Sequence, residues 1–150
     1  MSKPQDNAPG LEEKDRAFVR DSMMFSSLNA IQFGTVMAMS KVLMVKKDQP
    51  LFVQNQAAHY FFVLVHGQIK LTRTGIDGNE KVIDLIHPSQ SFAEAVVLSQ
   101  YDVYPVNALA IINSRVIAIE AQTYLGFLKQ STELCLGVMA RMGQRMHWLI

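Results

Sequence analysis

The chain has 150 residues, 49% of them hydrophobic, a formal net charge of +1 and a single cysteine. This composition is typical of one globular domain with a sizeable core, and it excludes intrinsic disorder. A single cysteine excludes an internal disulfide and an iron–sulfur cluster, and it fits a reducing cytoplasm. The balanced charge gives no sign of a nucleic-acid-binding surface, and no apolar run is long enough to cross a bilayer. We therefore expect a cytoplasmic protein without a membrane partner.

The first 40 residues predict helices after a loose start. Residues 1–10 are polar and contain two prolines and a glycine, as expected of a lead-in without regular structure. Residues 11–24 and 29–39 carry apolar side chains at helical spacing, although Gly34 weakens the second run. We assign residues 1–20 to this lead-in and its helix.

From residue 41 the apolar side chains alternate with polar ones, which predicts strands. Asp77-Gly78 is the strongest hairpin signal, and Gly67, between two strand-like runs, indicates a bulge or a close approach of two backbones. About six to eight short strands with regular turns are typical of a β-barrel or sandwich, which we assign to residues 21–130. The expected strands are 41–47, 51–53, 60–65, 68–74, 81–86, 106–112 and 115–119. In the strand after the hairpin turn, the expected core residues are Val82, Leu85 and Ile86.

The helical period returns after residue 120. Residues 121–129 predict a short helix, and Ser131 or Thr132 is a suitable N-cap for a longer helix at 133–150. Apolar positions in the longer helix repeat at heptad spacing, which fits either a core helix of one chain or a helix that pairs with a second copy. No C-cap follows, so we expect a cut dimerisation helix at 131–150. Its interface residues would be Cys135, Val138, Met139, Met142, Met146 and Leu149.

The stretch 91–108 is the candidate ligand site because its small-residue turn at 92–95 carries a carboxylate, Glu94, within an otherwise apolar run. Small residues and a short helix start let backbone N–H groups come close to an anion, and Glu94 is suited to accept a hydrogen bond from a hydroxyl. The alternative is an ordinary connection between strands, with Glu94 in solvent. The candidate ligand-binding residues are Phe92, Ala93, Glu94, Ala95, Tyr104 and Pro105.

The whole succession of elements resembles the effector domain of the catabolite activator/fumarate-nitrate reduction regulator superfamily. The matching segments are 60–71, 75–81 and 92–95. The resemblance implies a mainly β fold with flanking helices: a double-stranded β-helix (jelly roll) followed by a long C-terminal dimerisation helix. It also implies a homodimeric bacterial transcription regulator that is not an enzyme. The DNA-binding helix-turn-helix of such regulators follows the long helix and is absent from this chain.

The candidate site departs from the cyclic AMP binders of that superfamily. They carry Gly-Glu and then Arg-Ser or Arg-Thr about ten residues later, whereas this chain has Ala93-Glu94 and Tyr104-Pro105. Burying a cyclic phosphate without a fixed cation costs several kcal/mol. The nearest arginines, Arg73 and Arg115, belong to other segments. We therefore expect no tight binding of cyclic AMP.

The variant Phe-Ala-Glu-Ala, with tyrosine at the later position, resembles the branch that contains the dissimilatory nitrate respiration regulator. This resemblance implies nitric oxide sensing through haem, held in an apolar pocket between the barrel and the long helix. The sequence does not identify an axial ligand, because the four histidines His59, His66, His87 and His147 have no flanking motif.

Two alternatives stay open. The first is a cyclic-nucleotide-binding module with an atypical phosphate pocket. The second is a cupin-type enzyme, which is disfavoured because no His-x-His pair is present.

Overall fold

The computed structural model describes residues 10–149, and side chains as far as Met146. The expected lead-in therefore lies almost entirely outside the described residues. The elements in chain order are α1 (Glu13–Arg20), α2 (Ala30–Ala38), β1 (Lys41–Val45), β2 (Pro50–Phe52), β3 (Tyr60–His66), β4 (Ile69–Thr74), β5 (Glu80–Ile86), β6 (Ser91–Phe92), α3 (Ala95–Leu98), β7 (Asn107–Ala110), β8 (Ser114–Glu120), α4 (Ala121–Gln130) and α5 (Thr132–Leu149).

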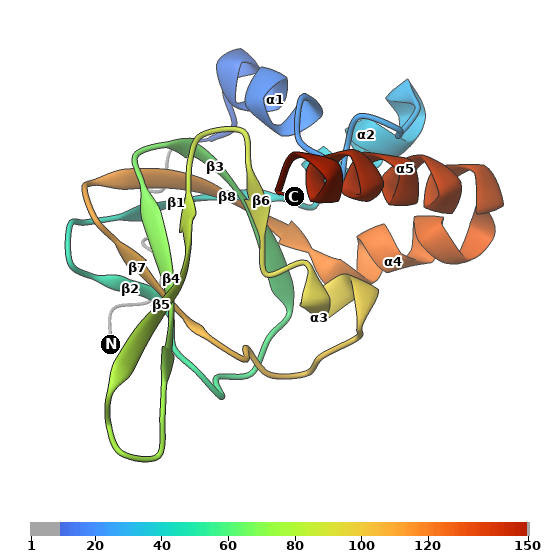
Figure 1. Ribbon diagram of the computed structural model, residues 1–150. Coiled ribbons are helices and arrows are strands. Elements are labelled where there is room, and N and C mark those ends of the chain that lie inside the picture. Colours follow the sequence, from blue (N-terminus) through green and yellow to red (C-terminus); the bar gives the residue numbers. More distant parts are fainter. Residues whose placement is uncertain (1–9, 150) are drawn as a thin grey trace.

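The strands form two antiparallel sheets of four strands each, in the orders β1-β8-β3-β6 and β2-β7-β4-β5. Figure 1 shows the two sheets facing each other, with α1, α2, α4 and α5 gathered beside the sheet that contains β3 and β8. The expected jelly roll with flanking helices and a long C-terminal helix is confirmed.

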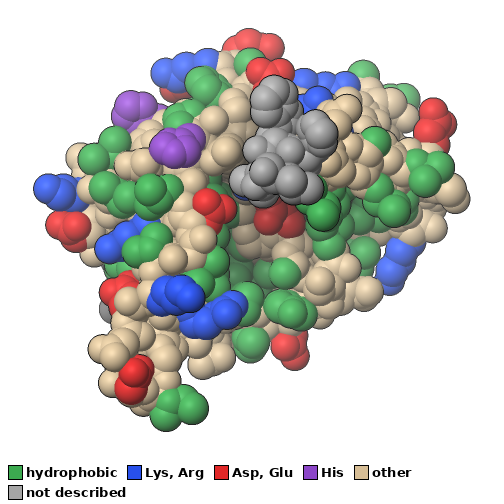
Figure 2. Space-filling view, in the orientation of Figure 1, with side chains coloured by type: hydrophobic (Ala, Val, Ile, Leu, Met, Phe, Trp, Pro, Cys, Tyr) green, Lys and Arg blue, Asp and Glu red, His purple; other side chains and the backbone are tan. Residues whose placement is uncertain are grey.

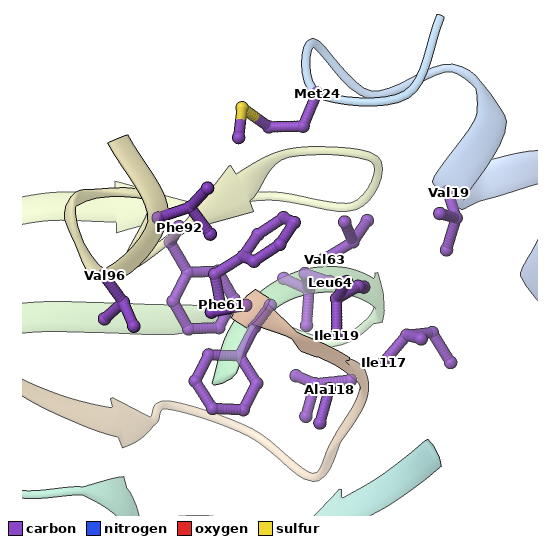
Figure 3. Close-up of a cluster of buried hydrophobic side chains, with 14 of the residues drawn as sticks. Val19, Met24, Phe61, Val63, Leu64, Phe92, Val96, Ile117, Ala118 and Ile119 are labelled. Carbon is purple, nitrogen blue, oxygen red and sulfur yellow. The ribbon is translucent and has the colours of Figure 1, made fainter. Parts of the chain in front are cut away.

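The central strand β3 is buried on both faces, since every side chain from Phe61 to Val65 is buried. Phe61 faces the helices, where it packs against Phe25 and Tyr124. Phe62 faces the opposite way, into the barrel, where it packs against other aromatic rings. Figure 3 shows Phe61 among the buried side chains contributed by β3, β8 and the helices. This arrangement explains why the sequence of β3 is a continuous apolar run.

Gly67 lies at a close approach of β3 and β8, as its sequence context predicts. Its φ is +101°, and a Cβ atom there would lie 2.7 Å from the backbone Cα of Ser114. The backbone N–H of Gln68 donates a hydrogen bond to Ser114 Oγ at 3.1 Å. The register between β3 and β8 shifts at Leu64/His66, so the expected bulge is confirmed as well.

The core prediction for β5 is wrong for two of its three residues. Ile86 is buried, but Val82 and Leu85 are 55% and 44% exposed. The reason is topological: β5 is an edge strand of its sheet, and the β4–β5 hairpin projects from the body of the protein (Figure 1). Alternation in sequence cannot distinguish such a strand from one that is covered on one face.

Candidate functional site

The candidate segment forms a tight turn followed by a short helix. β6 ends at Phe92, Ala93 adopts a left-handed backbone conformation with φ +62°, and α3 begins at Ala95. The left-handed region favours glycine, so Ala93 occupies a position where a glycine would be unstrained. The expected short helix is therefore present, in the segment where the family resemblance implies that the ligand binds.

Glu94 is held in place and does not extend freely into solvent. Its side chain is half-buried, and the hydroxyl of Ser91 donates a hydrogen bond to Glu94 Oε1 at 2.7 Å. Ser91 is itself buried at the start of β6. The carboxylate keeps a second oxygen for another donor, which is what a ligand hydroxyl would require.

Tyr104 is a buried member of an aromatic cluster inside the barrel. Its ring lies almost parallel to that of Phe52, with centroids 3.9 Å apart, and the cluster also includes Phe62 and Phe92. The Tyr104 hydroxyl donates a hydrogen bond to the carbonyl oxygen of Tyr60 at 2.9 Å. Burial raises the pKa of Tyr104 to about 12. The side chain is therefore neutral, and its hydroxyl proton is already used in the hydrogen bond to Tyr60.

The two arginines nearest in sequence do not supply a cation to the barrel interior. Arg115 donates from Nε and Nη2 to Asp15, at 2.9 and 2.6 Å. Arg73 is exposed near the end of β4. Among residues 10–146, the buried polar or charged side chains are Asp15, Ser22, Thr72, Ser91 and Ser114, and none of these is a cation. The interior that the candidate segment borders is therefore aromatic and uncharged.

Among the residues whose side chains are described, no histidine is buried as an axial ligand for haem would be. The side chains of His59, His66 and His87 are all exposed, and the side chain of His147 lies outside the described part of the chain. The inner barrel is filled by the rings around Phe52 and Phe62. Within the part that the structure describes, no group of three or more His, Cys, Asp or Glu side chains is placed to hold a metal ion.

Figure 2 shows a hollow in the surface below the C-terminal end of α5, between the β4–β5 hairpin and the segment that carries α3. Hydrophobic side chains line much of the hollow, with an acidic side chain at its upper edge and Lys or Arg side chains at its lower left margin (Figure 2). An opening of this kind favours an apolar group over an exposed anion, since no buried cation stands behind it in the described structure.

The long helix α5 begins as expected, but the apolar residues that it exposes differ from the expected interface residues. The backbone N–H of Leu134 donates to Ser131 Oγ at 3.0 Å, which identifies Ser131 as the cap. Val138 is only 2% exposed and belongs to the protein's own core, so its assignment to a dimer interface is wrong. Cys135 and Met142 are half-buried, and Cys135 donates to the carbonyl oxygen of Leu128.

The exposed apolar side chains of α5 form a stripe that coincides with the expected seam only in part. Leu136, Met139 and Met146 are 59%, 62% and 63% exposed. Ala140 and Gly143 lie between them at helical spacing and are also exposed. Met139 and Met146 are common to the expected interface and this stripe, whereas the side chain of Leu149 lies outside the described residues.

Two features of the site were not predicted from sequence. Phe52 and Phe62 complete the aromatic cluster around Tyr104. They come from strands that are distant from Tyr104 in the chain, and no local pattern links an apolar strand residue to a particular partner.

Within residues 10–149, no helix is long and apolar enough to span a membrane.

The comparisons with known proteins agree on one protein family. The cyclic nucleotide-binding domain model matches residues 42–131. The cyclic AMP receptor protein of Thermus thermophilus is 20% identical over 112 residues, which are 75% of this chain and 51% of that protein. The chain therefore spans about half the length of this curated relative.

Two solved structures are also similar. The structure of DNR from Pseudomonas aeruginosa has a TM-score of 0.84 at 25% identity, covering 92% of this chain and 61% of that one. The sensor domain of the transcriptional regulator DNR from the same organism has a TM-score of 0.78 at 26% identity, covering 89% of both chains. The two chains are thus similar over most of their lengths.

Proposed function

Because the chain belongs to the cyclic nucleotide-binding domain family, we propose that it is the effector-sensing and dimerisation domain of a bacterial transcription regulator. The similarity in extent and fold to the DNR sensor domain supports this assignment. In this proposal the protein is cytoplasmic and regulatory, not catalytic, and it contacts DNA through a domain outside this sequence. Its partner is a second copy, joined through the exposed stripe of α5.

We propose further that the effector is not a cyclic nucleotide phosphate. The single observation that carries this proposal is the stacking of Tyr104 on Phe52, at the position where cyclic AMP binders have arginine. The Tyr104 side chain is neutral and buried, and its hydroxyl already donates a hydrogen bond to the carbonyl oxygen of Tyr60. It therefore cannot balance the charge of a phosphate. The hydrophobic hollow in Figure 2 and the half-buried Glu94 are better suited to an apolar effector that carries a hydroxyl.

The effector would act by favouring one arrangement of α5 over another. α3 packs against α4, and α4 packs against α5, so the candidate segment is connected to the long helix by direct contacts. A ligand shifts such an equilibrium only by its difference in affinity for the two arrangements. The movement of α5 would then change the spacing of the DNA-binding domains in a dimer.

Isothermal titration calorimetry with cyclic AMP and cyclic GMP tests the proposal. We expect no binding at ligand concentrations of about 1 mM, which corresponds to roughly −4 kcal/mol or weaker. The alternative, a cyclic-nucleotide module with an atypical phosphate pocket, predicts micromolar binding that Glu94→Gln weakens. Such a result would replace our proposal with that alternative.

Haem-based sensing of nitric oxide remains a prediction from the resemblance to the nitrate respiration branch. Its test is an absorption spectrum of the protein titrated with haem. A Soret band that saturates at one haem per chain would identify haem as the effector. A spectrum that is the sum of free haem and protein would remove this candidate.

A further inference from the structure

The turn that joins β4 to β5 lies at the tip of the hairpin that projects from the body of the protein (Figure 1). All residues from 73 to 85 are exposed, and the side chain of Ile76 is fully exposed. Two backbone hydrogen bonds close the turn: Gly78 N–H donates to Gly75 O at 3.0 Å, and Gly75 N–H donates to Asn79 O at 2.9 Å. Both lie within the hairpin, so the turn can open without disturbing the barrel.

The carboxylate of Asp77 folds back over this turn. Its Oδ1 accepts a hydrogen bond from the backbone N–H of Asn79 at 3.1 Å, and its Oδ2 accepts one from Asn79 Nδ2 at 2.8 Å. A Cβ atom added at Gly75 would lie 2.9 Å from Asp77 Oδ1. A side chain that bonds to the backbone two residues on brings its Cγ atom close to the peptide nitrogen in between. Here that nitrogen belongs to Gly78.

Gly78 presents this nitrogen without steric protection. Its φ is +81°, and an added Cβ would meet no atom within 4 Å. Because glycine has no side chain, the nitrogen is open to attack Asp77 Cγ, and the backbone is free to adopt the conformation of a five-membered ring. Two reacting groups that are held side by side react much faster than separated ones. The hydrogen bond from Gly78 to Gly75 must open first, which the exposed position of the turn permits.

We propose that Asp77 is a site of spontaneous isomerisation to isoaspartate. The Gly78 nitrogen bonds to Asp77 Cγ, while the N–H proton and the hydroxyl of the protonated carboxyl group leave together as water. The product is a succinimide ring. Water then adds to one of its two carbonyl carbons and breaks the C–N bond there. Opening at Cγ restores aspartate, whereas opening at the main-chain carbonyl carbon gives isoaspartate. One water is lost and one is gained, and nothing is oxidised or reduced.

Isomerisation would change the shape of the hairpin tip. It inserts one methylene group into the backbone, so we expect the two backbone hydrogen bonds of Gly75 to be lost. The neighbouring pair of Thr74 and Glu80 would then separate more easily. The change would stay within the tip, because Thr74 N–H also donates to Gln54 Oε1 at 3.0 Å, outside the hairpin. The inference goes beyond the proposed function, since it concerns neither the effector segment nor α5.

Asp84 provides a comparison within the same chain. It is also exposed, and the backbone N–H of Leu85 donates to Asp84 Oδ1 at 2.8 Å. Its carboxylate therefore also lies near the next peptide nitrogen. That nitrogen, however, belongs to a leucine within β5, where pairing with β4 and the bulky side chain oppose ring closure. We expect Asp84 to remain aspartate.

Incubation of the full chain for several weeks, at physiological temperature and mildly acidic pH, tests the proposal. Peptide mapping with electron-transfer dissociation then distinguishes isoaspartate from aspartate. We expect at least about five times more isoaspartate at Asp77 than at Asp84. Gly78→Ala should lower the level at Asp77 at least about fivefold, because the added methyl group shields the nitrogen. Gly126→Ala, in α4, is the matched control and should leave the level unchanged.

Two outcomes would overturn the inference: no more isoaspartate at Asp77 than at Asp84, or an unchanged level at Asp77 in Gly78→Ala. Thermal melts before incubation confirm that each variant is folded. The cyclic nucleotide and haem titrations do not involve the hairpin tip. Failure of the proposed function therefore leaves this inference standing, and the reverse also holds.

Discussion

Asp15 and Arg115 form a bidentate ion pair that links the first helix to the barrel. The aspartate is fully buried, the arginine side chain is 11% exposed, and the Nη2–Oδ2 distance is 2.6 Å. The backbone N–H of Glu12 also donates to Asp15, at 2.7 Å, so the same carboxylate caps α1. The hydrogen bonds from Arg115 lower the pKa of Asp15 below its ordinary value of 3.8.

Replacing Asp15 by asparagine should destabilise the protein strongly. The substitution leaves the Arg115 charge largely buried without its partner, and breaking such a pair costs about 3 kcal/mol or more. Because the folded-state pKa of Asp15 is lowered, the ion pair stabilises the fold fully above the unfolded pKa and progressively less as the pH falls below it. Urea unfolding at pH 7 and at several pH values below 4 should therefore show a difference between the two proteins that shrinks on acidification.

Glu13→Gln is the control for this prediction. Glu13 also lies in the first turn of α1, but it is exposed. We expect its loss to change the free energy of unfolding by less than about 1 kcal/mol at any of these pH values. Equal effects of the two substitutions would show that the helix dipole, and not the pair with Arg115, accounts for the stability.

Gly67 and Gly78 provide a matched test of the close contact between β3 and β8. Both have positive φ angles, +101° and +81°, but an added Cβ would meet Ser114 at Gly67 and nothing within 4 Å at Gly78. Gly78→Ala should cost about 1 to 2 kcal/mol, from backbone strain alone. Gly67→Ala should cost at least about 2 kcal/mol more, because the contacted atoms include backbone. Chemical denaturation measures both, and similar costs would contradict the importance of the contact.

The sequence predicted those parts of the fold that depend on local patterns. The apolar patterns located the described strands except the two-residue β6, and the bulge or close approach expected at Gly67 is present. The hairpin at Asp77-Gly78 follows from its turn residues, and β4 and β5 pair on either side of it. These features depend on neighbours in sequence, where steric and turn preferences act directly.

The sequence did not predict contacts between distant segments. Asp15 and Arg115 are 100 residues apart, and nothing in either segment indicates the other. The heptad spacing in α5 is real, but spacing alone cannot say whether a residue packs on its own barrel or on a partner. Val138, at an expected interface position, belongs to the core, whereas Met139 and Met146 are exposed. Likewise, only the structure brings Arg141 and Arg145 beside the 89–91 turn.

The packing of α5 against the N-terminal segment depends on the absence of a side chain at Gly137. A Cβ there would lie 2.5 Å from Ser27 Oγ and 2.7 Å from Ser27 Cβ. Alanine is the better helix former by about 1 kcal/mol, so an open site gains stability from the substitution. Gly126, in α4, has nothing within 4 Å of an added Cβ and is the matched control.

We expect the two glycine substitutions in helices to have opposite signs. Gly126→Ala should raise the free energy of unfolding by about 0.5 to 1 kcal/mol, whereas Gly137→Ala should lower it by about 1 kcal/mol or more. Urea denaturation measures both. Stabilisation by Gly137→Ala would mean that α5 is not packed on Ser27 in solution.

The exposed stripe on α5 predicts the surface through which two copies pair. Met139 lies near the middle of this stripe and is 62% exposed, and Leu136 and Met146 beside it on the helix are 59% and 63% exposed, so that together they form an apolar patch. Met139→Lys should place a charge in the interface and weaken the dimer at least about tenfold, as measured by sedimentation equilibrium. Met44→Lys is the control, because Met44 is similarly exposed, at 58%, but lies on β1. If both variants remain dimeric, or if the unchanged protein sediments as a monomer at millimolar concentration, this surface does not join two copies of the chain.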